Sequence, residues 1–303
     1  MRGRGVAVHS HNKWGLSERI APQHEDTSNT MLTVTFRFDT ATAVTPIVEK
    51  NGSTTFSAEV FDGWDITGNA NGGYLLAMMG RAMQQHSCRR DPFTVTAHYL
   101  APAPAGPLEI EVDTVKTGKL VTTMNATMRR GDRNIMRVLG AWGEMAAVEP
   151  QIVTAIPPDL PPFEECASRD SDGGDFVIGL LQNVTNRLHP DDSTFISGTP
   201  SGTAQMRGWI ELADGRPMDT LALLLAVDAM PPPLFNLPYE KGWVPTLELT
   251  VHVRAVPVGK RLACSFRTKV VQGGLLEEDG EIWDESGTLV ALSRQMALAP
   301  RVV

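Results

Sequence analysis

Cysteine is scarce in this sequence, and its few copies form no cluster. The 303 residues contain three cysteines, Cys88, Cys166 and Cys264, which are odd in number and far apart. They form no C-x-x-C pair and no Cys/His spacing typical of a zinc site. A disulfide framework is therefore excluded as the organising feature. The sequence predicts a reducing compartment, with the cytoplasm as the default.

Basic stretches and long apolar runs are also missing. The net charge is −8, and lysine and arginine are scattered apart from pairs at 89–90 and 129–130. Without a basic stripe to replace counterions, we expect no nucleic-acid partner. No apolar run approaches the length of about 18 residues that a membrane span needs. Residues 1–4 begin no signal-peptide pattern, so the sequence predicts a soluble protein.

Several catalytic motifs are absent. The sequence has no G-x-S-x-G elbow, no P-loop, no G-x-G-x-x-G after a strand and no H-E-x-x-H. A hydrolase serine, a nucleotide-phosphate loop and a zinc-protease site are therefore not expected, and no metal site is predicted. His98 and His252 occupy equivalent positions of the internal repeat described below. We expect a structural role for that pair.

The remaining chain divides at two poorly patterned segments. Residues 1–30 are polar and lack apolar periodicity, which predicts a disordered N-terminal extension. Met31 opens the first patterned segment, so the tail is hypothesised to result from an early start codon. Residues 149–171 carry five prolines and are predicted to be a linker.

The two patterned regions, 31–148 and 172–303, repeat one order of elements. The first is expected to hold a turn at 71–73, a helix at 74–85, and strands at 33–38, 54–60, 93–100, 108–117, 121–130 and 134–142. The second is expected to hold a helix from Asp219 or Thr220 to Met230, and strands at 176–187, 204–212, 246–255, 261–271, 276–283 and 288–297. Residues 96–100 align with 250–254, and 81–83 with 228–230.

A helix plus about five antiparallel strands, used twice, predicts an α+β double hotdog. In that fold each curved sheet wraps around a central helix, and pairing of the two units covers an exposed sheet edge. Here the pair would be covalent. A homo-oligomer of such chains is a further possibility that the sequence leaves open.

Asp228 is the candidate catalytic residue. It follows the apolar run 221–227 and precedes three prolines at 231–233. Burial and the negative end of the helix dipole would both raise the pKa of this carboxyl group, which suits a general base. A surface aspartate beside a helix end is the alternative interpretation.

The order of several short motifs resembles the acyl-CoA thioesterase II family of double-hotdog enzymes, including its actinobacterial members. The motifs are Phe61-Asp62-Gly63-Trp64, Asn71-Gly72-Gly73-Tyr74, residues 94–100, Gly208-Trp209-Ile210, residues 214–219, residues 245–250 and residues 287–291. The resemblance implies that Asp228, Thr246 and Gln295 hold the attacking water. It implies no metal and no cofactor, because coenzyme A is part of the substrate.

The chemistry of thioester hydrolysis fits these residue types. Water must be the nucleophile, because no serine or cysteine is placed for covalent attack. Asp228 can accept its proton while Thr246 and Gln295 direct it. Backbone N–H groups of Gly72 and Gly73, which follow Asn71 at a helix start, are candidates for binding the negative oxygen and the substrate.

The repeat predicts one working site per chain, because Arg81 aligns with Asp228 and the counterpart of Thr246 falls near Pro92. The sequence therefore predicts a thioesterase acting on a fatty acyl-CoA or a related acyl thioester in lipid metabolism. The alternatives are a non-catalytic acyl-thioester binding protein and a hotdog enoyl-CoA hydratase. A hydratase requires an Asp/His pair in the site.

Overall fold

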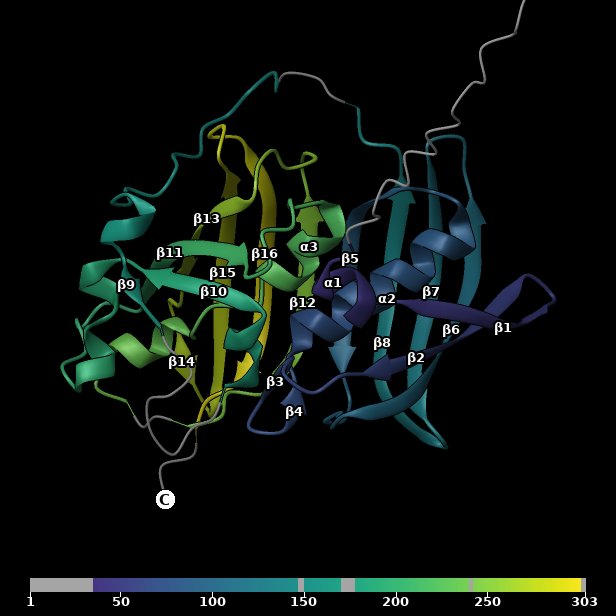
Figure 1. Cartoon of the computed structure of the whole chain (residues 1–303), viewed down its shortest axis with the longest axis horizontal. Helices are drawn as coiled ribbons and strands as arrows, with labels where there is room; N and C mark the ends of the chain where they lie inside the picture. Colours follow the sequence, from purple (N-terminus) through teal and green to yellow (C-terminus); the bar gives the residue numbers. More distant parts are fainter. Residues whose placement is uncertain (1–34, 147–149, 170–177, 240–241, 301–303) are drawn as a thin grey trace, which may run out of the picture. The chain divides into compact units, whose positions relative to one another are not determined.

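The computed structural model describes residues 35–146, 150–169, 178–239 and 242–300, whose strands, apart from the short pair β3–β4, form one antiparallel sheet with helices on one face (Figure 1). The first half contains α1 (Arg37–Ala41), β1 (Val44–Lys50), β2 (Ser53–Val60), β3 (Asp65–Ile66), β4 (Asn69–Ala70), α2 (Gly72–Ser87), β5 (Asp91–Tyr99), β6 (Gly106–Thr117), β7 (Val121–Arg130) and β8 (Arg133–Gly143). The predicted α+β class and antiparallel sheet are confirmed.

The second half uses shorter elements around the same kind of sheet. It contains η1 (Phe163–Glu165), β9 (Ala167–Ser168), η2 (Gly179–Gln182), β10 (Val184–Leu188), η3 (Pro190–Asp192), η4 (Thr194–Ser197), β11 (Gln205–Leu212), α3 (Thr220–Ala226), η5 (Pro233–Asn236), β12 (Thr246–Val253), β13 (Arg261–Arg267), β14 (Val271–Gln272), β15 (Leu275–Asp284) and β16 (Leu289–Leu298).

The strand order is nearly symmetric about its centre. It runs β1-β2-β6-β7-β8-β5-β12-β16-β15-β13-β11-β10-β9, so each of the six strands of the first half has a counterpart in the second, which adds β9 at its edge. At the centre β5 pairs antiparallel with β12, with Thr96 opposite Thr250. The two threonine hydroxyls lie 2.9 Å apart and hydrogen-bond across the junction. The halves therefore share one continuous sheet.

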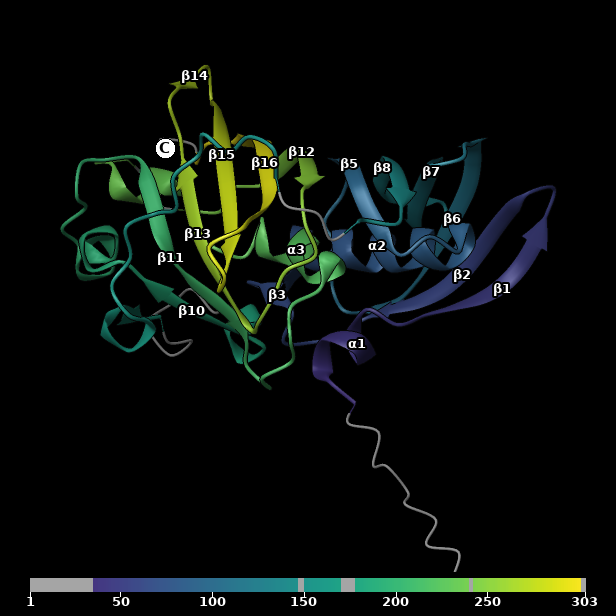
Figure 2. The same cartoon turned by 90° about the horizontal axis from the view of Figure 1, so that it is seen from above.

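Helices α2 and α3 contact each other on the same face of this sheet (Figures 1 and 2). Asn71 caps α2 by accepting a hydrogen bond from the Tyr74 N–H at 2.9 Å, and Asp219 caps α3 in the same way from the Ala222 N–H at 2.8 Å. All seven residues of α3 are buried, as expected for a helix without a polar face. No helix in the described part of the chain is long and apolar enough to cross a membrane.

Most predicted elements are present, but three predictions are wrong. In the segment predicted as a strand at 33–38, the described residues 35–38 instead lead into helix α1, because Phe38 and Ala41, three residues apart, both face the core. The second helix ends at Ala226, four residues before its predicted end at Met230. Within the predicted strand 176–187, residues 179–182 form the 3₁₀ helix η2.

Strand β1 was not predicted, because it lacks the expected alternation. Six of its seven residues are exposed, and it contains Pro46, which suits an edge strand. Within the predicted linker, Phe163 lies beneath the guanidinium groups of Arg187 and Arg261. The predicted disordered segment 1–30 and Met31 lie outside the described residues.

Candidate active site

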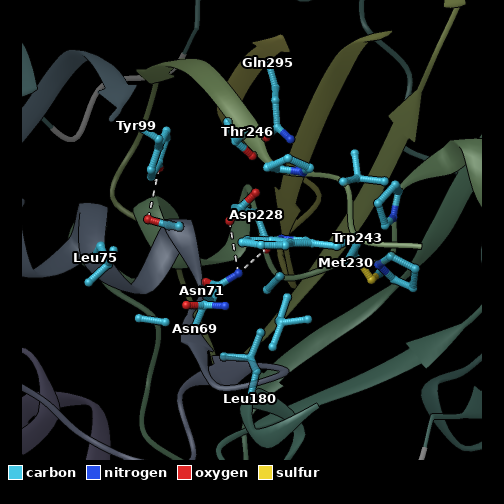
Figure 3. Close-up of a pocket in the computed structure, with 18 of the residues that line it drawn as sticks. Asn69, Asn71, Leu75, Tyr99, Leu180, Asp228, Met230, Trp243, Thr246 and Gln295 are labelled. Atoms are coloured by element: carbon cyan, nitrogen blue, oxygen red, sulfur yellow. Dashed lines mark hydrogen bonds between the residues drawn. The ribbon is translucent and has the colours of Figure 1, made fainter. Parts of the chain in front are cut away.

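The start of α2 and the residues after α3 meet at Asp228. The Asn71 amide group donates to the Asp228 backbone carbonyl at 2.8 Å and to the carboxylate Oδ2 at 3.0 Å. The Gly73 N–H donates to the same Oδ2 at 2.9 Å. These contacts bring together three of the predicted site residues from opposite halves of the chain, of which Asn71 and Asp228 are labelled in Figure 3.

Glycine is required at 72 and 73 by this close approach. A Cβ atom at Gly72 would lie 2.9 Å from Asp228 Oδ2, and one at Gly73 would lie 2.6 Å from the Leu225 carbonyl oxygen. Tyr99 locks the same turn, because its hydroxyl donates to the Gly72 carbonyl at 3.0 Å. The Gly-Gly pair therefore allows the first turn of α2 to pack directly against the end of α3.

Burial dominates the electrostatics of Asp228. The side chain keeps a partial exposure, as expected for a residue that lines a pocket, but the surrounding protein excludes enough water to raise its pKa from 3.8 to about 6. The hydrogen bonds from Gly73 and Asn71 favour the ionised form and limit this rise. At neutral pH the group is an ionised carboxylate with a pKa close to that of a useful base.

Thr246 and Gln295 line the same pocket as Asp228, a cavity of about 270 Å³ (Figure 3). Thr246 begins β12, and Gln295 lies on the neighbouring strand β16. The Gln295 side chain is buried, and its Oε1 has no hydrogen-bond partner among the described residues. Much of the remaining wall is apolar, including Leu75, Ile178, Leu180, Val227, Met230 and Phe235.

The sequence analysis gave no site role to three titratable pocket residues: Tyr99, Arg169 and Glu278. Tyr99 lies in the motif at 94–100, which assigns it no function, and Arg169 lies in the predicted linker, where no motif marks it. Glu278 belongs to the acidic run 277–279, a pattern that usually indicates a solvated strand. Only the inward direction of the Glu278 side chain, which depends on strand register, could have distinguished it from a solvent-exposed glutamate.

The place in the first half that corresponds to the Asp228 pocket is filled by a side chain. The Thr96–Thr250 pair marks the symmetry axis between the two central strands, so Pro92 on β5 is the counterpart of Thr246 on β12. Gly140 lies opposite Val95 just as Gln295 lies opposite Leu249, which makes Gly140 the counterpart of Gln295. Counted from the two helix caps, the counterpart of Asp228 is Gly80. The predicted alignment of Arg81 with Asp228 is therefore wrong by one residue.

Trp142 occupies the space beside these glycines. Its fully buried indole ring would lie 3.9 Å from a Cβ at Gly80 and 2.5 Å from one at Gly140. Arg81 instead donates a hydrogen bond to Asp39 at 2.9 Å. Trp142 thus occupies the place in the first half that corresponds to the Asp228 pocket.

Histidine contributes nothing to the described wall of the pocket. His98 and His252 are exposed on the two central strands, opposite Glu248 and Thr94 respectively. Across the parts of the chain that the structure describes, no group of three or more His, Cys, Asp or Glu side chains is placed to hold a metal ion.

The strand order and the two helices define a protein with two related halves. The acyl-CoA thioesterase N-terminal domain model matches residues 61–143, and the acyl-CoA thioesterase C-terminal domain model matches residues 163–299. Together the two matches span more than half of the chain. The chain therefore belongs to the acyl-CoA thioesterase family.

Solved structures agree with this family. A candidate thioesterase II from Thermobifida fusca YX is 33% identical, with a TM-score of 0.80, over 88% of this chain and 98% of that one. A conserved protein of unknown function with a hot dog fold from Alicyclobacillus acidocaldarius is 23% identical, with a TM-score of 0.77, over 89% of this chain and 100% of that one. The predicted hotdog fold is thereby supported.

A curated relative from Mycobacterium tuberculosis (strain ATCC 25618 / H37Rv) is an uncharacterized protein. It is 24% identical over 287 residues, which cover 87% of this chain and 98% of the relative. The similarity extends through both halves, so the two-part organisation is shared.

Proposed function

We propose that this protein is an acyl-CoA thioesterase that hydrolyses a fatty acyl-CoA, or a related acyl thioester, to the free acid and coenzyme A. The observation that carries the proposal is the pocket in which Asp228, with its pKa raised to about 6, lies with Thr246 and Gln295. The apolar part of the pocket wall supplies a surface for an acyl chain.

In the proposed reaction, water attacks the thioester carbonyl carbon while Asp228 accepts a proton from it. The Thr246 hydroxyl and the Gln295 amide hold the water in the direction of attack. Asn71, Gly72 and Gly73 complete the proposed site. When Asp228 gains the proton it attracts the Gly73 N–H less strongly, and that donor can then stabilise the negative oxygen of the intermediate.

These side chains supply the chemistry without a metal or redox cofactor, because coenzyme A enters as part of the substrate. The proposal places the enzyme in the cytoplasm, in fatty acyl metabolism, with acyl-CoA as its partner. Self-association of double-hotdog chains is compatible with this role.

We also propose that residues 31–148 and 172–303 are two tandem hotdog units joined through 149–171. Helices α2 and α3 are the proposed central helices. The contacts of α2 with strands β5 to β8 and of α3 with β12 support this division, and the contact of α3 with β5 joins the two units. The second unit supplies the catalytic trio, and the first supplies the glycine turn.

A panel of acyl-CoA substrates from short to long chains, with free thiol measured, tests the proposal. We expect thiol release that Asp228→Asn abolishes. Saturable acyl-CoA binding without thiol release would instead indicate a binding protein. Consumption of an enoyl-CoA without free thiol would indicate a hydratase, an activity that the absence of histidine from the described pocket wall disfavours.

A further inference from the structure

Glu278 is a second carboxyl group in the pocket that no motif identified. It lies on β15 directly opposite Gln295 on β16, so both side chains leave the sheet on the same face. Residues 278, 280 and 282 are buried while 277, 279 and 281 are partly exposed, which places Glu278 on the inner face. Only 8% of Glu278 is exposed, and it lines the pocket that contains Asp228.

The neighbours of Glu278 on its own strand have partners, but Glu278 has none. Glu277 accepts hydrogen bonds from the Lys269 and Val270 N–H groups, and Asp279 forms an ion pair with Arg294 at 2.6 Å. No hydrogen bond or ion pair joins the Glu278 carboxyl group to any residue that the structure describes. An unpaired carboxyl group in such surroundings retains its proton.

The titratable groups around Glu278 reinforce this protonation. Burial is the main cause that raises its pKa well above the usual range, and the negative charges of Asp228, Glu277 and Asp279 add to it. The other titratable side chains of the described pocket wall are Tyr99 and Arg169. Arg169 exerts no charge effect on Glu278 large enough to offset these causes.

The two carboxyl groups of the pocket therefore differ: the pKa of Asp228 is about 6, whereas that of the unpaired Glu278 is raised well above its usual range. Environments that separate the pKa values of two carboxyl groups assign one as base and the other as acid. Such an acid can assist thioester cleavage, because an alkyl thiolate is a basic leaving group that departs more readily with a proton.

We propose that Glu278 is the general acid that protonates the departing sulfur of the substrate. The inference rests on the proposed thioesterase function. Water gives a proton to Asp228 and forms the C–O bond of the tetrahedral intermediate. When that intermediate collapses, the C–S bond breaks, its electron pair moves to sulfur, and the Glu278 proton joins the same sulfur. The products are the free acid and the thiol, and the proton on Asp228 returns to Glu278 to restore the site.

The test compares two leaving groups in Glu278→Gln. An acyl-CoA releases a basic alkyl thiolate, whereas an S-acyl 4-nitrothiophenol releases a weakly basic aryl thiolate that needs no proton. We expect Glu278→Gln to lower kcat for acyl-CoA by about 10²-fold or more, while kcat for the aryl thioester changes much less. Glu281→Gln is the matched control, because Glu281 lies on the same strand with its side chain on the opposite face.

The pH profile provides a second readout. The wild type is expected to lose acyl-CoA activity at high pH as Glu278 ionises, and Glu278→Gln is expected to lack that alkaline limb. Glu278→Asp retains an acid and is expected to keep the limb and recover part of the activity, which also covers the case in which the glutamine variant does not fold.

Three outcomes contradict the inference. Equal losses for both leaving groups, or full acyl-CoA activity in Glu278→Gln, would overturn the role of Glu278 while leaving an Asp228-dependent thioesterase intact. If the wild type releases no thiol from either substrate, the proposed function fails and the role of Glu278 fails with it.

Discussion

Asp228, the proposed general base, lies in an environment that disfavours its ionised form. Its pKa is raised to about 6 mainly by burial, although Gly73 and Asn71 donate hydrogen bonds to it. A carboxyl group whose pKa is higher in the folded than in the unfolded protein destabilises the fold once it ionises. Stability therefore falls as the pH rises from about 4 to above 6.

Replacement of Asp228 by asparagine is expected to stabilise the protein at pH 8. The difference between a pKa of 3.8 and one of about 6 corresponds to a gain of up to about 3 kcal/mol. This gain should disappear below pH 4, where the wild-type carboxyl group is protonated in both states. Urea unfolding of both proteins at pH 8 and pH 3.5 measures it. An equal stability difference at the two pH values would show that Asp228 does not titrate as described.

The same ionisation predicts the acidic limb of the activity profile. Because only the carboxylate can accept a proton from water, kcat/KM for an acyl-CoA is expected to fall below pH 6, by about tenfold for each further pH unit. Initial rates of thiol release between pH 4.5 and pH 8 measure this limb. A rate that stays constant down to pH 4.5 would exclude Asp228 as the titrating base.

At the scale of single residues, the sequence predicted part of the site. The raised pKa of Asp228 followed from the apolar run before it, and Thr246 and Gln295 do line its pocket. Glu278 and Tyr99 could not be predicted, since their inward directions depend on strand register and on which strand ends meet. Asn71 and Gly73 were predicted to belong to the site, but their hydrogen bonds to Asp228 were not, because these residues lie about 155 positions earlier in the chain.

The element that builds the site is the first turn of α2. A methyl group at position 73 would overlap the Leu225 carbonyl oxygen and approach the Asp228 Cβ at 3.0 Å, so neither helix could keep its place. The position tolerates no side chain even though its backbone lies outside the left-handed region.

Gly73→Ala is accordingly expected to lower both stability and activity. The overlap should cost about 1–3 kcal/mol, as overpacking of a core does, and displacement of Asp228 should reduce kcat. Thermal melting and thiol-release rates measure the two effects. Gln85→Ala, at an exposed position of the same helix, is the control and should change neither. A Gly73→Ala variant with wild-type melting and turnover would show that the two helices do not pack this tightly.

Long elements were predictable and short ones were not. Apolar periodicity indicated residues 74–85 of α2, and alternation indicated β6 and β7 almost to the residue. Helix α1 has five residues and depends on tertiary contacts, in which Phe38 packs near Trp64 and beneath Arg216. No local pattern of that length separates a helix from a strand.

Across the whole molecule, the repeat was the most useful signal in the sequence. The alignment of 96–100 with 250–254 implied that these strands are equivalent, and the structure pairs them at the centre of the sheet. The sequence could not predict that Trp142 occupies the place in the first half that corresponds to the Asp228 pocket. Its position there depends on the space left by the missing side chains of Gly80 and Gly140.

The shared sheet predicts cooperative unfolding of the two halves. Strand β12 lies between β5 and β16, and Val251 at the junction is fully buried opposite Val95. Separation of the halves would expose these strand edges and the surface between α2 and α3. Calorimetry is expected to show one transition with equal calorimetric and van't Hoff enthalpies. Val251→Ala should shift that whole transition downward, whereas two separate transitions would contradict a common core.

The most direct test of the account is thiol release from acyl-CoA by the wild type and by variants of the trio. Asp228→Asn should reduce kcat by about 10²-fold or more, and Thr246→Ala and Gln295→Ala should each lower it. Arg81→Ala, in the half whose site is filled, should keep most of the activity. Wild-type turnover in Asp228→Asn would contradict the central claim that this carboxylate activates the water.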